Sequence, residues 1–353
     1  MDLATRTPRI AIAWKGLPAY GARLIRSALD VATEPVVVLG TRAAVPVEGI
    51  EEQVGQPVVW LNDADSYSWT SLGLKTPQLF FQTSWATPAF NSLTLATKRA
   101  GGRVVCLHDN RLKRNLRQLL GSAYYRIALA RRYDAAWAPG SSGRQFCRLL
   151  GIPNDDIYEG LYSGWTEVFQ PGPALNERPT RILFVGQSNE RKGVDVLVRA
   201  WQAFRVDHPE WELHSYGQGP LQDLLASTSG ITAHPFLQSR EVAAAMRGAR
   251  FVVMPSLDDH WPLTIHEAAS SGCGLLLSEN VGNRHDLASD ANAIIFPCGD
   301  ARALEDTLRA AAGKDLEWLR HASADSVKLA SAFSPTRFGE VFKQICARYL
   351  PAR

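Results

Sequence analysis

The stretch that decides the fold reads FVVMPSLDDHWPLTIHEAASSGCGLLL, residues 251–277. Residues 251–254 are apolar and rich in β-branched side chains, and a proline ends this predicted strand. An acidic loop follows. Pro262 then fits the first position of a helix, which two glycines end before a second apolar run. This order of strand, loop, helix and strand is typical of an α/β protein.

The start of the predicted helix is suited to hold a phosphate, because free backbone N–H groups and the positive end of the helix dipole meet there. Glu267 lies about one and a half turns into the helix, and Asp259 lies in the loop before it. Two carboxylates beside an anion site suit a hydroxyl-rich ligand that carries phosphate, such as a nucleotide sugar. An ordinary strand–loop–helix unit with acids on its surface would give the same pattern, so this alternative stays open.

Length and composition indicate a globular protein of two domains, since 353 residues exceed the size of a typical single core. The small net charge of +3 gives no reason to expect a nucleic acid partner. No apolar run approaches the ~20 residues that span a bilayer, and the first residues do not resemble a secretion signal. The five scattered cysteines form no CxxC pair, so we expect a reducing, cytoplasmic location and no zinc site.

Apolar strands alternate with helical stretches through both halves of the chain, which favours mainly parallel sheets. A segment rich in proline and glycine, residues 153–179, predicts a linker between the halves. We therefore expect an α/β chain of two doubly wound Rossmann-like domains facing a central ligand cleft, residues 1–165 and 166–332. A closing helix in residues 333–353 is expected to pack back on the first domain. Strands are predicted at residues 9–14, 36–40, 58–61, 79–83, 103–107, 133–139, 181–186, 212–216, 231–235, 251–254 and 293–296.

Two polar groups follow predicted strands of the first half. Asn62-Asp63-Ala64-Asp65 could hold a metal-bound diphosphate, but its neighbours suit a turn equally well, and we expect no metal there. His108 closes the strand VVCL, so we expect it to face the ligand cleft rather than the core. A loop histidine without a function is the alternative.

The segment RLKRNLRQLLGSAYYRIALARRY, residues 111–133, carries seven arginines and lysines and no acid. Its leucines recur at helical spacing and predict an amphipathic helix. The pattern suits an anionic membrane surface or an anionic acceptor, although a solvated helix face would also explain it. The residues predicted to make these contacts are Arg111, Lys113, Arg114 and Arg117.

Three motifs in one order resemble glycosyltransferase family 4, whose members have the GT-B fold. The family pattern Pro-Ser-x-x-Glu-Gly-Phe-Gly-Leu-x-x-x-Glu-Ala falls on residues 255–268, and its Gly-Arg-Leu-x-x-x-Lys-Gly loop falls on residues 186–193. Its Gly-x-Gly-Pro falls on residues 217–220, which lack the third glycine of a dinucleotide fingerprint. The resemblance is clear over residues 181–308 and weaker but continuous before them.

The resemblance implies a role for several residues. Glu267 would bind the donor's ribose hydroxyls, Asp259 would lie near the donor sugar, and Lys192 would neutralise the diphosphate. The amides of Leu263 and Thr264 would hold its far oxygens, and His108 would lie near the transferred sugar. Lys192, Asp259 and His108 are thus the predicted catalytic residues. Other residues in loops that follow strands complete the predicted donor site: Gly16, Gly186, Gln187, Arg191, Gly217, Pro235 and Phe236.

The chain departs from the family pattern at two positions of this site. Asp259 stands where glutamate is usual, and Gln187 stands where the family has an arginine. Arg191 is our hypothesis for the replacement cation.

The resemblance implies a retaining glycosyltransferase of the hexosyltransferase type that takes a sugar from a UDP- or GDP-linked donor. The acceptor would be a glycan, a lipid-linked intermediate or a small molecule of envelope polysaccharide or glycoconjugate synthesis. No metal or other cofactor is expected, and the protein would work in the cytoplasm or peripherally at the inner face of the cell membrane. Two alternatives stay open: a glycoside hydrolase that uses paired carboxylates, and a nucleotide-sugar binding protein without catalysis.

Overall fold

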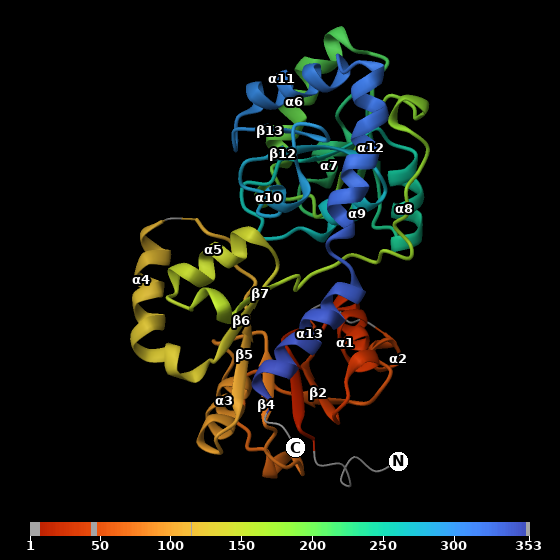
Figure 1. Ribbon diagram of the computed structural model, residues 1–353. Coiled ribbons are helices and arrows are strands. Elements are labelled where there is room, and N and C mark those ends of the chain that lie inside the picture. Colours follow the sequence, from red (N-terminus) through yellow and green to blue (C-terminus); the bar gives the residue numbers. More distant parts are fainter. Residues whose placement is uncertain (1–7, 44–47, 114, 351–353) are drawn as a thin grey trace. The chain divides into compact units, whose positions relative to one another are not determined.

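The computed structural model describes residues 8–43, 48–113 and 115–350, which form two units (Figure 1). Unit 1 comprises Met1–Ser163 and Pro335–Arg353, and unit 2 comprises Gly164–Ser334. Each unit contains one sheet of parallel strands with helices around it. The predicted class, α/β with two doubly wound halves, is confirmed.

The sheet of unit 1 has the strand order β3-β2-β1-β4-β5-β6-β7, and all of its pairings are parallel. Its strands are β1 (Ile10–Trp14), β2 (Val36–Thr41), β3 (Val58–Leu61), β4 (Leu79–Gln82), β5 (Arg103–Leu107), β6 (Ala135–Ala138) and β7 (Ile157–Glu159). Its α-helices are α1 (Ala19–Val31), α2 (Ile50–Val54), α3 (Pro88–Arg99), α4 (Leu116–Tyr124), α5 (Ser141–Leu149) and α13 (Pro335–Tyr349).

The sheet of unit 2 has the order β10-β9-β8-β11-β12-β13, again with parallel pairings. Its strands are β8 (Arg181–Val185), β9 (Glu212–Tyr216), β10 (Ile231–His234), β11 (Phe251–Met254), β12 (Gly274–Ser278) and β13 (Ala293–Phe296). Its α-helices are α6 (Val194–Asp207), α7 (Gln222–Ala226), α8 (Ser239–Arg247), α9 (Leu263–Ser270), α10 (Arg284–Leu287), α11 (Ala301–Ala312) and α12 (Leu316–Ser331).

The central strands explain why these sequences form doubly wound sheets. Every residue of β1 and β11 is buried, as expected for parallel strands that helices cover on both faces. In each sheet the chain order reverses beside the first strand, between β1 and β4 in unit 1 and between β8 and β11 in unit 2. Ligands of open α/β sheets bind at such switch points, beyond the carboxyl ends of the strands.

The last helix, α13, packs against α1 and belongs to unit 1 (Figure 1). Gly339 permits this contact, because a Cβ there would lie 2.8 Å from the carbonyl oxygen of Ser27. Phe338 stacks on Trp137 of β6 with 4.2 Å between the ring centroids. The helix thus covers one face of the first sheet.

Three details differ from the sequence prediction. The predicted linker contains β7, which extends the first sheet by pairing with β6; a three-residue strand among prolines and glycines is too short to recognise by pattern. The basic segment is not one continuous α-helix, because a π-helical turn (Tyr125–Leu129) and a 3-10 turn (Ala130–Arg132) follow α4. Pro262 precedes α9 rather than opening it, a shift of one residue.

Candidate functional site

The carboxyl edge of the second sheet brings together two predicted site residues that are far apart in the sequence. Lys192 follows β8 and Asp259 follows β11, the two strands at the switch point. The Lys192 Nζ lies 2.5 Å from Asp259 Oδ2, and the two side chains are only 11% and 13% exposed. A largely buried ion pair therefore stands where the sheet topology places a ligand.

Short-range sequence signals hold Lys192 at this place. It ends a 3-10 turn (Glu190–Lys192), and the Asn189 side chain caps the turn by accepting a hydrogen bond of 3.0 Å from the Lys192 N–H. Gly193 follows with φ 71°, and a Cβ there would overlap the carbonyl oxygen of Pro255. Lys192 is thus buried, although it lies in a turn where a lysine would ordinarily be exposed to solvent.

Backbone hydrogen bonds fix the loop of Asp259 against the loop after β12. The Asp259 N–H donates to the Asn280 carbonyl at 3.3 Å, and the Asp259 carbonyl accepts from the Gly282 N–H at 2.9 Å. On the carboxylate, Oδ2 also lies 3.7 Å from Arg191 Nη1. A lysine ammonium has three N–H donors, so one bond to Asp259 leaves capacity for an anionic ligand.

Arg191 takes part in the same arrangement. Its Nη1 donates to the Asp258 carbonyl at 2.9 Å, which directs the guanidinium toward the ion pair while half of the side chain stays exposed. Gln187 is exposed in the same loop and accepts a hydrogen bond from Asn189. The Arg191 guanidinium therefore lies close to the lysine, and its role as a replacement for the cation absent at Gln187 stays a hypothesis.

The N-terminus of α9 follows the Asp259 loop. As first residues of the helix, Leu263 and Thr264 present N–H groups that have no acceptor within the helix. The Asn283 amide donates to the Pro262 carbonyl at 2.9 Å and anchors this end of the helix. The helix start thus offers backbone donors and a positive dipole end, which are the requirements of an anion site.

Glu267 lies in the second turn of α9 and is partly exposed. The chain at Gly164 passes directly over it, because a Cβ on Gly164 would lie 2.8 Å from Glu267 Cγ. Only glycine permits this approach, so residue 164 confines the position of the carboxylate.

His266, next to Glu267, was not recognised from the sequence. It is fully buried; its Nδ1 accepts from the Gly164 N–H at 3.0 Å, and its Nε2 lies 2.8 Å from the Phe333 carbonyl. These partners require the neutral tautomer with the proton on Nε2, and burial lowers its pKa. The imidazole joins α9 to the first and last segments of unit 2, so it is a positioning residue for Glu267.

The loops after β8, β9 and β10 line the same edge of the sheet. Gly217 packs so closely on Gly186 that a Cβ would overlap the Gly186 carbonyl oxygen. Pro235 and Phe236 are exposed beyond β10. Gln222, a residue that the sequence did not indicate, connects these loops by accepting from the Ser188 hydroxyl at 2.8 Å and donating to the His234 carbonyl at 3.2 Å.

The sequence predicts that His108 faces the ligand cleft rather than the core, but in unit 1 its side chain is buried. Its N–H donates to the Trp137 carbonyl at 2.9 Å, which continues the pairing of β5 with β6. The imidazole is 3% exposed and lies among aromatic rings, those of Trp85, Tyr125 and Phe146. Burial lowers its pKa to about 4, and its Nε2 has no hydrogen-bond partner among the described residues. Aromatic packing overrides the tendency of a polar side chain to face water.

A cluster of polar side chains that the sequence did not indicate lies next to His108 along the chain. Tyr162 hydrogen-bonds to Asp109 and to Tyr20, and burial raises the pKa of Tyr20 to about 12. The two tyrosine rings pack edge to face at 5.7 Å. Nearby along the chain, Gly16 follows β1, and its N–H donates to the Thr41 hydroxyl at 2.9 Å. The carboxyl edge of the first sheet therefore presents phenol and carboxylate groups that can bind hydroxyls.

Other predicted residues have less specific positions. Arg111 and Lys113 are partly exposed and Arg117 is exposed, whereas Arg114 lies outside the described residues. Asn62 forms a turn by accepting from the Ala64 N–H, as the turn interpretation of residues 62–65 predicts. Within the described ranges, no three His, Cys, Asp or Glu side chains are grouped to hold a metal ion.

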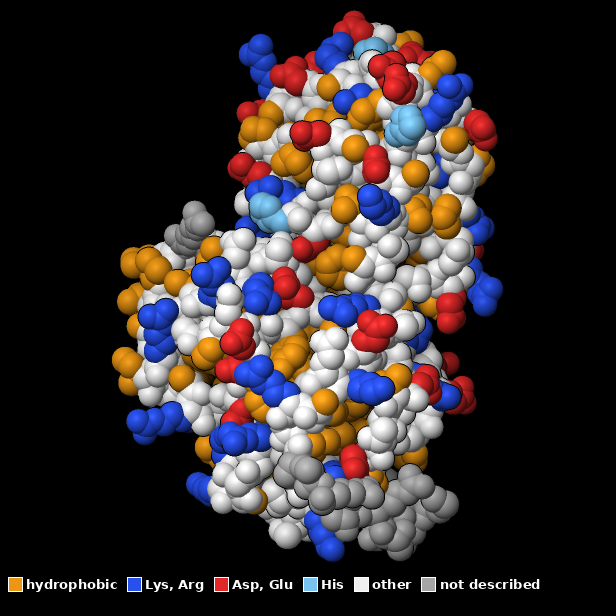
Figure 2. Space-filling model, viewed as in Figure 1, with side chains coloured by type: hydrophobic (Ala, Val, Ile, Leu, Met, Phe, Trp, Pro, Cys, Tyr) orange, Lys and Arg blue, Asp and Glu red, His pale blue; other side chains and the backbone are white. Residues whose placement is uncertain are grey.

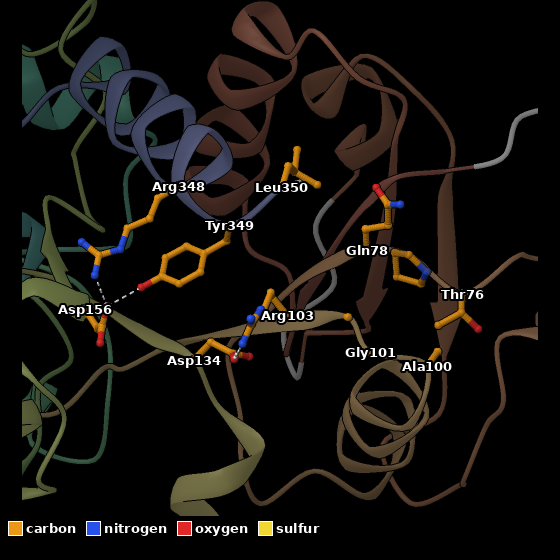
Figure 3. A pocket seen from close by; sticks show the side chains of 12 residues that line it. Thr76, Gln78, Ala100, Gly101, Arg103, Asp134, Asp156, Arg348, Tyr349 and Leu350 are labelled. Carbon is orange, nitrogen blue, oxygen red and sulfur yellow. Dashed lines mark hydrogen bonds and ion pairs between the residues drawn. The ribbon is translucent and has the colours of Figure 1, made fainter. Parts of the chain in front are cut away.

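A cavity of about 770 Å³ in unit 1 lies at the opposite, amino edge of the first sheet (Figure 3). Its charged groups are already paired: Asp134 with Lys98 and Arg103, and Asp156 with Arg348 at 2.7 Å. Because its acids are satisfied within the unit and it lies away from the strand ends that bind ligands, this cavity is not the candidate site.

Known proteins support the sequence resemblance. Residues 179–313 match the family model described as glycosyl transferases group 1. An exopolysaccharide phosphotransferase of Streptomyces coelicolor is 23% identical over 222 residues, which are 60% of this chain and 22% of that protein. A phosphatidyl-myo-inositol mannosyltransferase of Mycobacterium leprae is 28% identical over 149 residues, 40% of each chain. This chain thus spans less than half the length of either curated relative.

The solved structure of Anabaena Alr3699/HepE in complex with UDP and glucose has a similar fold, with a TM-score of 0.73 at 12% identity. The likeness covers 97% of this chain and 100% of that one. The whole described chain therefore shares the fold of this structure.

Proposed function

We propose that the chain transfers a sugar from a nucleoside-diphosphate sugar to a hydroxyl acceptor, as the match of residues 179–313 to the glycosyl transferases group 1 model suggests. The observation that carries the proposal is the Lys192–Asp259 ion pair of 2.5 Å at the switch point of unit 2. It places a fixed cation beside the N-terminus of α9, where a diphosphate finds both a charge and backbone donors.

In the proposed reaction the bond between the anomeric carbon and the diphosphate oxygen breaks, and the acceptor oxygen bonds to that carbon on the same face. The acceptor's proton goes to the leaving phosphate oxygen. Lys192, Arg191 and the amides of Leu263 and Thr264 meet the growing charge of the leaving group, so the proposal needs no metal. Glu267 binds the ribose, and Asp259 fixes Lys192 while it faces the donor sugar.

We assign the acceptor to unit 1. His108 with Tyr20, Asp109 and Tyr162 supplies groups that bind hydroxyls at the carboxyl edge of the first sheet. The acceptor we propose is a glycan or a lipid-linked intermediate, and the latter requires the protein to work at a membrane surface.

Thermal denaturation with nucleotides tests the donor half of the proposal. UDP is the first ligand to use, because the Anabaena protein of similar fold binds it, and GDP is the second nucleotide to compare. UDP should raise the melting temperature, in proportion to its affinity, whereas uridine should not. A Lys192→Met variant should lose the UDP shift. A glycoside hydrolase would show no shift with either diphosphate, and a protein that only binds would show the shift without turning over the donor sugar.

A further inference from the structure

A stripe of apolar side chains lies exposed on the outside of unit 1, over α4 and the π-helical turn after it. Its members are Leu116, Leu119, Leu120, Tyr124 and Ile127, of which Leu116 is 71% and Ile127 is 87% exposed. Single exposed apolar residues are ordinary, but a contiguous set of large ones marks an interaction surface. We call these five residues the apolar stripe.

The spacing of the stripe is that of one helix face. At about 100° per residue its members fall within an arc of roughly 140°. The residues that α4 and the following turn direct into unit 1 are different ones: Ser122, Tyr125 and Leu129 are buried. The helix is thus already packed on its inner side, and the stripe faces outward.

Basic residues flank the stripe, and the segment that carries it contains no acid. Arg117 and Arg126 are exposed on either side of the arc, and Arg131 is exposed just beyond it. No Asp or Glu occurs in the sequence from Asn110 to Tyr133. Figure 2 shows hydrophobic side chains along the outer edge of unit 1, where Figure 1 places α4, with lysine or arginine side chains beside them.

We propose that the apolar stripe docks on the surface of an anionic lipid bilayer. Its leucine and isoleucine side chains enter the boundary between headgroups and acyl chains, Tyr124 lies at headgroup level, and the flanking arginines contact lipid phosphates. No described helix is long and apolar enough to cross a membrane.

Charge favours lipid over a second copy of this chain. A symmetric pair would place the same basic residues of two copies against each other, with no acid of this segment to neutralise them. An anionic bilayer complements both the apolar and the basic parts of the surface. The docking needs neither donor nor acceptor, so it can be tested separately from the proposed transfer.

Vesicle sedimentation with the full chain is the test. The protein should bind vesicles of phosphatidylcholine and phosphatidylglycerol mixed equally, and at least about tenfold more weakly vesicles of phosphatidylcholine alone. Binding to the anionic vesicles should weaken as salt is raised, since the arginines are exposed to screening.

Paired variants locate the surface. Leu120→Ser with Ile127→Ser should reduce vesicle binding by about tenfold or more, without changing the melting temperature or the UDP shift, because both side chains are exposed. Val206→Ser with Leu316→Ser is the matched control, since these exposed apolar residues lie in unit 2 outside the stripe; it should bind vesicles as the unchanged protein does.

Three results would overturn the proposal. One is the absence of binding to anionic vesicles; another is an equal loss of binding in the control pair. The third is a concentration-dependent dimer in sedimentation equilibrium that Leu120→Ser with Ile127→Ser abolishes while vesicles bind neither form, which would make the stripe an interface between copies.

Discussion

The carboxyl edges of the two sheets have the same topology but opposite chemistry. In unit 2 the switch point holds a buried ion pair of lysine and aspartate beside a helix N-terminus. In unit 1 the corresponding strand ends hold a neutral histidine among aromatic rings and a cluster of phenols around Asp109. One topology thus presents different chemical groups in the two units, and the residues that follow each strand decide which.

The two buried histidines differ in their hydrogen-bond partners. His266 has hydrogen-bond partners on both ring nitrogens, the Gly164 N–H and the Phe333 carbonyl. His108 has a buried Nε2 with no partner among the described residues. A buried polar atom without a partner costs free energy, so the surroundings of His266 satisfy its imidazole and those of His108 do not.

Removal of the cation should have the largest effect. Lys192→Met should lower turnover about 10²–10³-fold, because the leaving diphosphate loses its fixed charge. It should also reduce the free energy of unfolding by about 1–3 kcal/mol, since the buried Asp259 carboxylate loses its nearest cation and keeps only Arg191, 3.7 Å away. Steady-state kinetics and urea denaturation measure the two effects.

A double variant separates these two effects. Lys192→Met with Asp259→Leu should recover most of the stability but none of the activity, because the buried charge is gone while the cation is still missing. Turnover within tenfold of the unchanged protein in Lys192→Met would contradict the role of this lysine.

Replacing each histidine with phenylalanine tests whether the hydrogen bonds of His266 stabilise the fold while the imidazole of His108 does not. His108→Phe keeps the aromatic packing and removes the unpaired nitrogen, so stability should be kept or raised while turnover falls about 10²-fold. UDP binding should not change, because the residue belongs to unit 1. His266→Phe should instead lower stability through the loss of two hydrogen bonds. Full activity of His108→Phe would make that residue structural.

A smaller, selective effect is expected at Glu267. Glu267→Gln should weaken UDP binding about 10- to 100-fold, the value of a hydrogen bond to a charged group. Calorimetry with 2′-deoxy-UDP is the control. The substitution should reduce the affinity for this ligand less than the affinity for UDP, because 2′-deoxy-UDP lacks one of the hydroxyls that the carboxylate binds. An equal loss of affinity for both ligands would show that Glu267 does not bind the ribose hydroxyls.

The sequence predicted the charged site better than the aromatic one. Lys192 and Asp259 follow strands that neighbour each other in a doubly wound sheet, so the topology rule and the motifs both bring them together. His108 depends on Trp85 and Phe146 packing around it, and His266 on partners 102 and 67 residues away. Neither contact leaves a local pattern, because such packing is set by tertiary structure and not by spacing along a helix or strand.

The two histidines should also give the protein a common dependence on pH. Burial lowers the pKa of both, to about 4 for His108, whereas an unfolded histidine titrates near 6.5. Below about pH 6.5 the unfolded chain takes up protons that the folded chain refuses, so stability is lost as pH falls toward 4. At pH 5 the burial of His108 should lower the free energy of unfolding by about 2 kcal/mol relative to pH 7.5, and His266 should change it in the same direction. Urea denaturation should show a smaller loss of stability for His108→Phe between pH 7.5 and pH 5. Identical pH profiles for His108→Phe and the unchanged protein would show that His108 is charged or exposed in solution.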